Sequence, residues 1–411
     1  MKVIAITARI LLGAMFVFSG FVKAVDPWGS TYKFIDYFTA FDMIWMQPAA
    51  FMLAIIQNSA ELFIGVALVL GLRMKETAWG ALLFMGFYTP LTLFLALTNP
   101  VSDCGCFGDA LVLTNWETFF KNVAFLVPTV FIFYYRKKYV PAYKPVGEWS
   151  WVALITIVIV GISIHCHRHL PWIDFRPYHI GADIPQKMSI PEDAPVAEYH
   201  TTLIYEKDGI QQKFSMNDFP WNDTTWVFVD AISVEVKKGY VPPIQNFSIM
   251  TARGADITHD ILEYEGHTFL LVAHRLNSSN KQALEKASEI ADFCNQHGYR
   301  FYCLTAAPQS EVEYLKSELR LRYDFGFTDE TTLKTIIRAN PGLVLLQKGV
   351  VLGKWHYNDM PDAADLRPNL LSFAMEKQAK KSKNLLIRGL LLAFVFFSFV
   401  FFRYRIKITE N

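Results

Sequence analysis

Charged residues are scarce in this chain of 411 residues, because Asp, Glu, Lys and Arg together make up only 19%, against about 25% in soluble domains. Neither sign dominates, since 39 Lys and Arg stand against 38 Asp and Glu. This balance argues against nucleic acid as a partner, which calls for a basic stripe, and against a disordered chain, which needs high net charge. Five cysteines are too few for a disulfide scaffold. Hydrophobic residues make up 52% of the chain, which argues against an enzyme that is soluble over its whole length.

The hydrophobic residues are concentrated in segments long enough to cross a bilayer, which takes about 20 mostly apolar residues. Six segments qualify: 3–22, 43–72, 77–98, 118–135, 149–164 and 384–402. The region 165–383 has no comparable run. The fold class predicted is therefore a membrane α-helical bundle, a four-helix unit plus two further helices, with a large polar domain before the last helix. We expect the first segment to be retained rather than cleaved as a signal peptide, because further spans follow it.

Basic residues in the short loops predict the orientation of the bundle. They fall on one side of a six-helix topology: Lys2, Arg73, Lys75, Arg136, Lys137, Lys138, Lys144, Arg403, Arg405 and Lys407. That side is predicted to be cytoplasmic, so the loop 99–116 and the domain 165–383 would face the periplasm from a bacterial inner membrane. Four lysines disagree, because they precede the last helix on the predicted outer side: Lys377, Lys380, Lys381 and Lys383. Charges attached to a long translocated domain count less.

Two cysteines, Cys104 and Cys106, lie in the loop 99–116 and are separated by Gly105. A disulfide over so short a span needs a distorted backbone, which glycine permits, and strained exposed disulfides are readily exchanged. The functional interpretation is a redox-active pair at the membrane surface. A static disulfide clip and two unpaired thiols are the alternatives. No metal site is predicted, because two cysteines do not complete a zinc shell.

Several short motifs accompany this loop, and the Asp103–Gly108 stretch is the most specific of them. The others are Arg9–Gly13, Ser19–Lys23, Glu61–Gly65, Leu70–Arg73, Asn115–Thr118 and Lys121–Asn122. Over about residues 1–140 they resemble the DoxX-like superfamily, specifically its methylamine-utilisation MauE branch. The resemblance implies an inner-membrane protein that supports disulfide formation or maturation of a periplasmic amine dehydrogenase beside a thioredoxin-like partner. Wider DoxX relatives are linked to quinone-coupled redox chemistry, so a quinone is the cofactor that the resemblance implies.

Two ionisable residues lie inside predicted spans, Arg9 in the first and Glu61 in the second. Their depths, counted from the predicted cytoplasmic ends, are similar, so we expect an ion pair. Intramembrane charges are costly and are usually paired or functional. The pair would serve either as a quinone or proton site or as a contact that fixes helix packing. Gln57, one helical turn before Glu61, would share the network.

The fifth span is followed by His165, Cys166, His167, Arg168 and His169. Such a set could bind a metal in an extended segment. The alternative is a group of solvated residues at the level of the lipid headgroups. Cys166 could instead exchange with Cys104 or Cys106, since all three are predicted at the outer surface.

The region 165–383 is predicted to begin with short strands at 201–206, 211–214, 225–230 and 233–237. The pattern then alternates: strand 268–274, helix 281–297, strand 299–305, helices 310–319 and 329–337, and a hairpin of 342–347 with 350–356. This order resembles the thioredoxin-like fold over about residues 240–360, and the resemblance implies a cis peptide bond before Pro341.

The predicted thioredoxin-like domain lacks the Cys-x-x-Cys of that fold, because Arg275–Asn280 stands in its place. Cys294 and Cys303 are predicted to be core residues. Trp355 and Tyr357 are expected at the core more than at a binding surface. The domain is therefore predicted to be redox-inactive and to dock a partner.

Three hypotheses follow, and they differ in whether the chain is an enzyme. In the first, Cys104 and Cys106 exchange disulfides with a periplasmic thioredoxin-like or client protein. In the second, the chain is a non-enzymatic envelope scaffold that presents an interaction domain. In the third, it is a quinone-linked oxidoreductase subunit that uses Glu61. In each case membrane lipid surrounds the helices.

Overall fold

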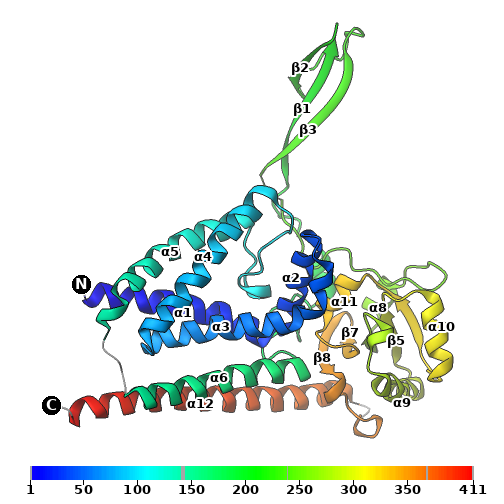
Figure 1. Cartoon of the computed structure of the whole chain (residues 1–411). Coiled ribbons are helices and arrows are strands. Elements are labelled where there is room, and N and C mark those ends of the chain that lie inside the picture. The colour runs from blue at the N-terminus through cyan, green and yellow to red at the C-terminus, as the bar shows by residue number, and fades with distance from the viewer. Residues whose placement is uncertain (1, 140–143, 238, 367–368, 410–411) are drawn as a thin grey trace. The chain divides into compact units, whose positions relative to one another are not determined.

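The computed structural model describes residues 2–139, 144–237, 239–366 and 369–409 (Figure 1). The chain divides into two compact units, Met1–Ala182 with Ser248–Asn411, and the intervening Asp183–Phe247. The first unit holds the apolar helices and an α/β domain, and the second holds a small antiparallel sheet. The predicted basic side chains of Lys2, Arg403, Arg405 and Lys407 lie outside the described side chains.

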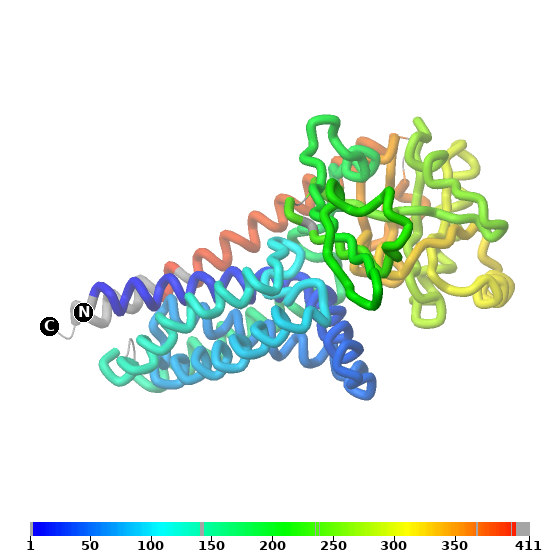
Figure 2. The backbone as a smooth tube through the Cα atoms, turned by 90° about the horizontal axis from the view of Figure 1, so that it is seen from above, coloured from blue at the N-terminus to red at the C-terminus, as the bar shows by residue number. Residues whose placement is uncertain are grey.

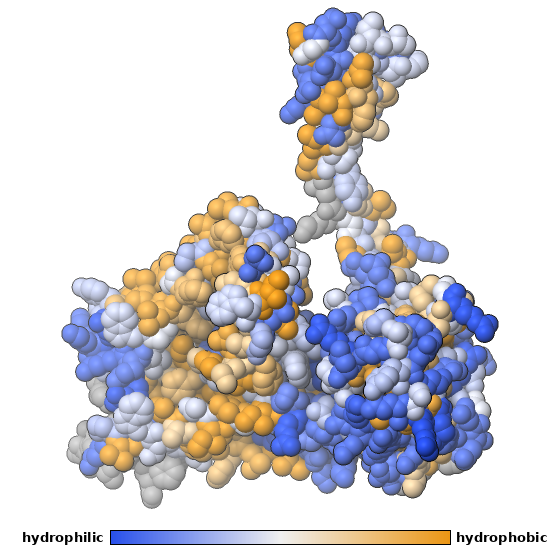
Figure 3. All heavy atoms as spheres, turned by 45° about the vertical axis from the view of Figure 1, so that its right-hand side comes forward, coloured by the Kyte–Doolittle hydropathy of each residue, from blue (hydrophilic) through white to orange (hydrophobic). Residues whose placement is uncertain are grey.

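Six helices of the described chain are long and apolar enough to cross a membrane. They are α1 (Lys2–Val25), α3 (Ala50–Leu70, after the 3-10 helix η1, Ile44–Ala49), α4 (Met74–Thr98), α5 (Asn115–Tyr135), α6 (Pro145–Arg168) and α12 (Leu370–Thr409). Five of them each contain one predicted apolar segment, and the predicted segment 43–72 covers η1 and α3. Hydrophobic residues dominate the surface of these helices, whereas the α/β domain is mostly hydrophilic (Figure 3). The start of α1 and the end of α12 lie at the same end of the bundle (Figures 1 and 2).

Two glycines, Gly13 and Gly20, let α1 pack closely against α3. A Cβ atom on Gly20 would collide with the backbone of Leu62, and one on Gly13 would lie 3.0 Å from the backbone nitrogen of Val69. Small residues permit such an approach between helices in a membrane. Because the later glycine meets the earlier partner, the helices run antiparallel. This contact fixes which residues of the two helices share a level.

A short helix that the sequence did not predict, α2 (Pro27–Ala40), follows α1. Asp26 caps it by accepting a hydrogen bond from the Gly29 backbone nitrogen at 3.1 Å, and Pro27 suits the first turn because its missing N–H would have no partner there. The helix has 14 residues, which is too short to cross a bilayer. It brings Lys33 and Tyr37 to the loop between α4 and α5.

The α/β domain contains a five-stranded sheet in the order β6-β5-β4-β7-β8. Its elements are α8 (Thr258–Leu262), β4 (His267–Val272), η4 (Leu276–Ser278), α9 (Lys281–His297), β5 (Arg300–Thr305), α10 (Gln309–Glu318), β6 (Asp324–Phe327), α11 (Glu330–Ile336), β7 (Gly342–Gln347) and β8 (Val350–His356). Strands β4, β5 and β6 are parallel, and the β7–β8 hairpin is antiparallel to β4. This is the predicted thioredoxin-like fold. The Asn340–Pro341 bond is cis, as predicted.

The core of the α/β domain extends into α12. Phe269 of β4 and Leu284 of α9 are fully buried, and Leu370 and Phe373 from the first turn of α12 pack into the same cluster. Because these residues belong to the core, the helix begins at Leu370 and not near the predicted residue 384, and it continues without a break into the apolar span. One unbroken helix therefore joins the core of the α/β domain to the last membrane span.

The cysteines and aromatic residues of the sheet lie where the sequence predicts. Cys294 and Cys303 are fully buried, and burial raises the pKa of both thiols. Trp355 is also buried, and Tyr357 packs against the same core. Neither of these two thiols is available for exchange chemistry in this arrangement.

The second unit contains α7 (Ile184–Met188) and a sheet of β1 (Glu198–Lys207), β2 (Ile210–Ser215) and β3 (Val227–Lys237) in the order β2-β1-β3. The predicted strands 225–230 and 233–237 are one continuous strand, β3. Asp208 and Gly209 both have positive φ angles, as the tight turn between β1 and β2 requires.

Candidate functional site

The cysteine loop connects α4 to α5, and its two thiols are close together. The Sγ atoms of Cys104 and Cys106 lie 3.1 Å apart, and both cysteines are free thiols. Gly105 between them has a φ of +67°, and a Cβ atom there would lie 2.9 Å from Cγ of Lys33. Only glycine combines that backbone angle with that space. The Cys-Gly-Cys order is therefore required by the loop geometry that faces the two sulfurs toward each other.

Three side chains from α1 and α2 hold the backbone of this loop. The Ser19 hydroxyl donates to the Cys106 carbonyl at 2.6 Å, and the Tyr37 hydroxyl donates to the Cys104 carbonyl at 2.9 Å. Burial raises the pKa of Tyr37, so it keeps its donor proton. Lys33 donates to Asp103 at 2.7 Å, and the other oxygen of Asp103 accepts from the Gly105 nitrogen at 2.8 Å. The loop is thus fixed on both sides of the thiol pair.

The two thiols differ in acidity. The hydrogen bond shared with Cys104, and then the nearby cations Lys121 and Lys23, lower the pKa of Cys106, although burial opposes them. The same hydrogen bond together with burial raises the pKa of Cys104 well above its ordinary value. These opposite directions make Cys106 the more acidic thiol of the pair, and the thiolate is the form that attacks disulfides.

Both thiols line a cavity of about 200 Å³ that reaches between the helices. We call it the inner cavity. Most of its wall is aromatic and apolar: Phe16, Phe34, Phe38, Phe41, Phe84, Phe87, Tyr88, Met15, Met43, Met85 and Leu91. Its polar wall includes Lys23, Gln57 and Glu61. The cavity can therefore hold a flat apolar molecule beside the thiols, with a few hydrogen-bonding groups to orient it.

Glu61 pairs with Lys23, and not with Arg9 as the sequence predicted. The Lys23 ammonium lies 2.6 Å from the Glu61 carboxylate, and the two side chains are only 7% and 5% exposed. Gln57 lies on the wall of the same cavity. Asn58, which the sequence analysis did not single out, donates to the Lys23 carbonyl and to the Ser30 hydroxyl, each at 3.0 Å.

Arg9 lies at the other end of the α1–α3 contact. Its guanidinium packs against Gly71 and over the Tyr139 ring, 5.9 Å from the ring centroid. Glu61 precedes Gly71 by ten residues, which is about 15 Å along a helix at 1.5 Å per residue. The predicted Arg9–Glu61 pair was wrong because it assumed that depth can be counted from the helix ends. The contacts of Gly13 and Gly20 determine which residues of α1 and α3 lie at the same level.

The opposite face of the cysteine loop borders a second cavity of about 240 Å³, the outer cleft, which the α/β domain closes. Gly105 lines both cavities, whereas the two cysteines line only the inner one. Arg338, buried at 6% side-chain exposure, bridges the cleft: it lies 2.7 Å from Asp109 and 3.0 Å from Asp26. The loop that precedes cis-Pro341 is thus tied directly to the cysteine loop.

The cis-proline loop is also bonded to the segment that replaces Cys-x-x-Cys. The Asn340 side chain donates to the Arg275 carbonyl at 2.8 Å and accepts from the Ser279 hydroxyl at 2.9 Å. Asn280 caps α9 by accepting from the Ala283 nitrogen. Hydrogen bonds of polar side chains therefore join the cis-proline loop to the segment Arg275–Asn280, which has no cysteine.

The three histidines at the end of α6 have different polar or aromatic partners. His165 lies 2.9 Å from the Arg388 guanidinium, and His169 lies 2.8 Å from Asp359, while the two rings stack on each other. The His167 ring lies 4.5 Å from the Phe51 ring in a tilted arrangement. Among the described residues no three metal-ligating side chains come together. Cys166 is fully buried against Val25 and Ile162, in a different cluster from the thiol pair.

Sequence reasoning missed Lys23, Tyr37 and Arg338 as members of the site. Lys23 was visible as the last residue of the Ser19–Lys23 motif, a lysine in the final turn of a span. Tyr37 lies in the unpredicted helix α2. Arg338 lies far along the chain from the loop that it contacts, and no local pattern marks it.

Comparisons with known proteins agree with part of this description. Residues 1–135, which include the cysteine loop, match a family model described as methylamine utilisation protein MauE, so the predicted resemblance is confirmed. Residues 199–238 match a family described as a domain of unknown function, DUF8463. The comparison with curated proteins finds no match. A Bacteroides thetaiotaomicron protein proposed to be a disulfide isomerase has a similar solution structure, with 12% identity, a TM-score of 0.24, and coverage of 33% of this chain and 84% of that chain.

Proposed function

We propose that this multi-pass membrane protein exchanges disulfides through Cys104 and Cys106 with extracytoplasmic partner proteins. The observation that carries the proposal is the pair of thiols 3.1 Å apart in a loop whose backbone is held by Ser19, Tyr37 and Asp103. A geometry that keeps two free thiols in contact favours reversible closure to a disulfide over a static clip. The MauE match supports clients that belong to methylamine utilisation.

The exchange runs through a mixed disulfide. The Cys106 thiolate attacks one sulfur of a partner disulfide, so a Cys106–partner bond forms and a partner thiolate leaves. The Cys104 sulfur, after losing its proton, then attacks Cys106, which closes the Cys104–Cys106 bond and releases the second partner thiol. Two electrons pass from this chain to the partner, and the reverse sequence oxidises a partner dithiol. The acidity difference between the thiols supports Cys106 as the attacking group.

The thioredoxin-like domain serves as the docking element in this proposal. It has no cysteine at Arg275–Asn280, and its cis-proline loop is tied to the cysteine loop through Arg338. A partner that binds near this loop would therefore lie against the cysteine loop, on the face opposite the one from which the thiols line the inner cavity. The proposal places both on the periplasmic side of a bacterial inner membrane, on the basis of the basic residues at Arg73, Lys75 and 136–138.

Thiol trapping in membranes tests the exchange. Pulses of reductant and oxidant, followed by alkylation and mass spectrometry, should interconvert Cys104 and Cys106 between dithiol and disulfide. The Cys104→Ser variant should accumulate a mixed disulfide on Cys106, because the resolving thiol is gone. Cys106→Ser should accumulate none, and Cys294→Ser, a buried control, should behave as the wild type. Thiols that keep one redox state through every pulse would refute the proposal.

The scaffold hypothesis makes the opposite genetic prediction. Replacing both Cys104 and Cys106 by serine would leave the cellular phenotype intact if the chain only presents an interaction domain, whereas deleting residues 165–383 would abolish it. Under the exchange proposal the double serine variant loses function as completely as the deletion does.

A quinone-linked activity is a second candidate, and the inner cavity is the observation that favours it. The aromatic wall fits a flat ring, and Lys23, Glu61 and Gln57 are placed to bind ring oxygens. A bound quinone would supply a two-electron acceptor beside the thiols. Purified protein should then retain quinone, and Phe84→Trp, which narrows the cavity, and Glu61→Gln should both lose it. Equal quinone content in the wild type and both variants would exclude this role.

A further inference from the structure

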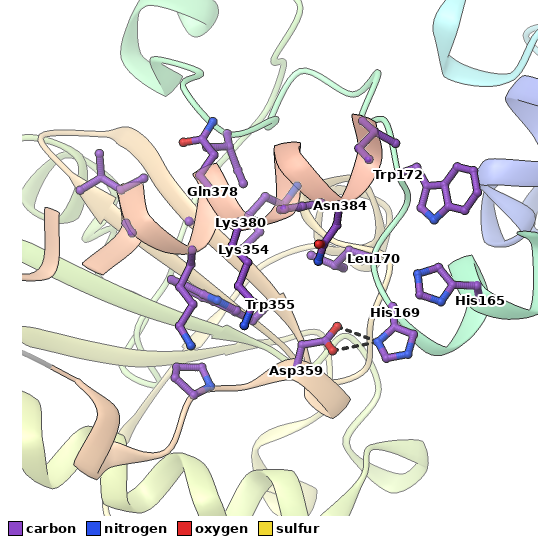
Figure 4. A pocket seen from close by; sticks show the side chains of 18 of the residues that line it. His165, His169, Leu170, Trp172, Lys354, Trp355, Asp359, Gln378, Lys380 and Asn384 are labelled. Carbon is purple, nitrogen blue, oxygen red and sulfur yellow. Dashed lines mark hydrogen bonds and ion pairs between the residues drawn. The ribbon is translucent and has the colours of Figure 1, made fainter. Parts of the chain in front are cut away.

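A third cavity, of about 340 Å³, lies where α6 ends and α12 passes the sheet of the α/β domain (Figure 4). We call it the basic pocket. Its wall is formed by His165 at the end of α6 and residues of the segment that follows it, by β8 and the turn after it, and by α12. Figure 4 shows His165, His169 and Trp172 on one side and Lys354, Lys380 and Asn384 on the other. The pocket shares no lining residue with the inner cavity.

The charges of the basic pocket are strongly unbalanced. Its lysine and arginine members are Lys354, Lys377, Lys380, Lys381 and Arg388. Lys354 pairs with Asp174 at 2.6 Å, behind the wall. Asp359 is the one carboxylate in the wall, and His169 already contacts it. Within the described part of the chain, no ion pair joins the remaining four cations to a carboxylate. A concave site with four uncompensated positive charges is complementary to an anion.

Arg388 is the residue of the pocket wall that lies furthest along α12. Its guanidinium lies 2.9 Å from the His165 ring nitrogen and 5.3 Å from the centroid of the Trp172 ring. Arginine on an aromatic face, at the end of a membrane span, is typical of the interface between headgroups and acyl chains. Its planar fork of donors suits the oxygens of a phosphate group.

A separate apolar groove lies further along α12, in the membrane region. It has a volume of about 230 Å³ and lies between α1, α3, α6 and α12, with walls that include Leu392, Ile159 and Phe399. Leu392 is one helical turn beyond Arg388, and it packs in the same cluster as Trp172. A basic pocket and an apolar groove thus follow one another along α12, in the order of a phospholipid's headgroup and acyl chain.

We propose that this combined site binds one anionic phospholipid, with its phosphate in the basic pocket near Lys381 and Arg388 and an acyl chain in the groove. The proposal also accounts for the lysines at 377–383 that oppose the orientation indicated by the other loops. Three of them, Lys377, Lys380 and Lys381, line the pocket. Their positive charge serves lipid recognition, so it does not report on topology.

Native mass spectrometry of the full-length protein in neutral detergent tests this site, with phosphatidylglycerol and phosphatidylcholine as probes. Phosphatidylglycerol should bind at least tenfold more tightly. The double variant Lys381→Gln with Arg388→Gln should weaken it by about 25-fold, since each basic residue near a membrane surface contributes about fivefold. Lys383→Gln, on the same helix but outside the pocket wall, is the matched control and should bind as the wild type does.

Each other outcome counts against the proposal. Equal affinity of the wild type for the two lipids would refute it without any variant, so a misfolded double variant does not leave it untested. An equal loss in Lys383→Gln would show diffuse surface attraction. Complete displacement of phosphatidylglycerol by millimolar glycerol phosphate, which has the headgroup chemistry but no acyl chain, would show that a soluble phosphate ester is the ligand.

Discussion

The inner cavity and the basic pocket both have cations in their walls, but these cations are paired differently. In the inner cavity the buried cation Lys23 meets the carboxylate of Glu61 at 2.6 Å. In the basic pocket Lys377, Lys380, Lys381 and Arg388 have no carboxylate partner among the described residues. The ion pair between Lys23 and Glu61 stabilises the packing of α1 against α3 and leaves the inner cavity suited to a neutral ligand. Cations without a carboxylate partner contribute little to packing and are instead available to bind an anion.

The largest effect is expected when the Lys23–Glu61 ion pair is broken. Glu61→Gln leaves Lys23 buried without a partner, which should lower the free energy of unfolding by about 3–5 kcal/mol. Adding Lys23→Met should recover much of this loss, because replacing both partners removes the unpaired charge. By contrast, Lys380→Gln, at the exposed rim of the basic pocket, should change it by no more than about 0.5 kcal/mol. Thermal unfolding in detergent measures the change in stability of all three variants. Equal losses for Glu61→Gln and Lys380→Gln would show that the paired and unpaired cations contribute equally to stability.

Arg338 is a second paired cation, and its removal should cost less. Arg338→Gln leaves Asp26 and the half-exposed Asp109 without their cation, and we expect a loss of about 2 kcal/mol because solvent reaches Asp109. The effect should be local. Hydrogen exchange should accelerate in residues 103–110 and near 338–341, while β5 stays protected. Unchanged exchange in the cysteine loop would show that the contact does not hold it.

Gly105→Ala sharpens the comparison within the thiol site. An alanine there must adopt a positive φ of about 67° and displace Lys33, at a cost of about 1–2 kcal/mol. The strain falls on the residue between the cysteines, so the two sulfur atoms should lie further apart. Disulfide formation between them should therefore be slower. Rapid-quench alkylation after an oxidant pulse measures that rate. Gly86→Ala, where a Cβ atom meets nothing within 4 Å, is the control.

The smallest effect concerns the acidity of Cys106. Its pKa is lowered to about 6, chiefly by the hydrogen bond from Cys104, so the thiolate predominates above that pH and is lost as the pH falls through it. Alkylation of Cys106 should therefore slow below about pH 6. In Cys104→Ala the pKa should rise toward its ordinary value, and the alkylation rate at pH 7 should fall severalfold. A pH profile that does not move would mean that Lys121 and Lys23 alone set the acidity.

Much of the helical architecture was predictable from the sequence, because a long apolar run has few alternatives to a membrane span. The thioredoxin-like order of strands and helices and cis-Pro341 were predictable for a similar reason, since buried strands and a loop proline have strong local patterns. Helix α2 was not predicted, because Lys33 and Asp36 interrupt its apolar residues. Strand β6 was missed because it has four residues, one of them Gly326.

The thiol pair was predictable, but its surroundings were not. Only Gly105 separates Cys104 from Cys106 in sequence, so their spacing already indicates their proximity. The Lys23–Glu61 pair depends on the register that Gly13 and Gly20 set between α1 and α3, which no count from helix ends provides. Arg338 meets Asp26 across 312 positions of sequence, and such a contact is a property of the folded chain alone.

The bridge made by Arg338 has a thermodynamic consequence for the cysteine loop. Arg338, in the loop before cis-Pro341, forms an ion pair with Asp109, which lies three positions after Cys106. If disulfide closure shifts Asp109, the two states of the thiol pair bind that loop with different free energies. Reciprocity then requires that a molecule that binds at the loop shift the thiol–disulfide equilibrium by the same factor. The α/β domain, which has no reactive cysteine, would in this way influence the reduction potential of the Cys104–Cys106 pair through the guanidinium of Arg338.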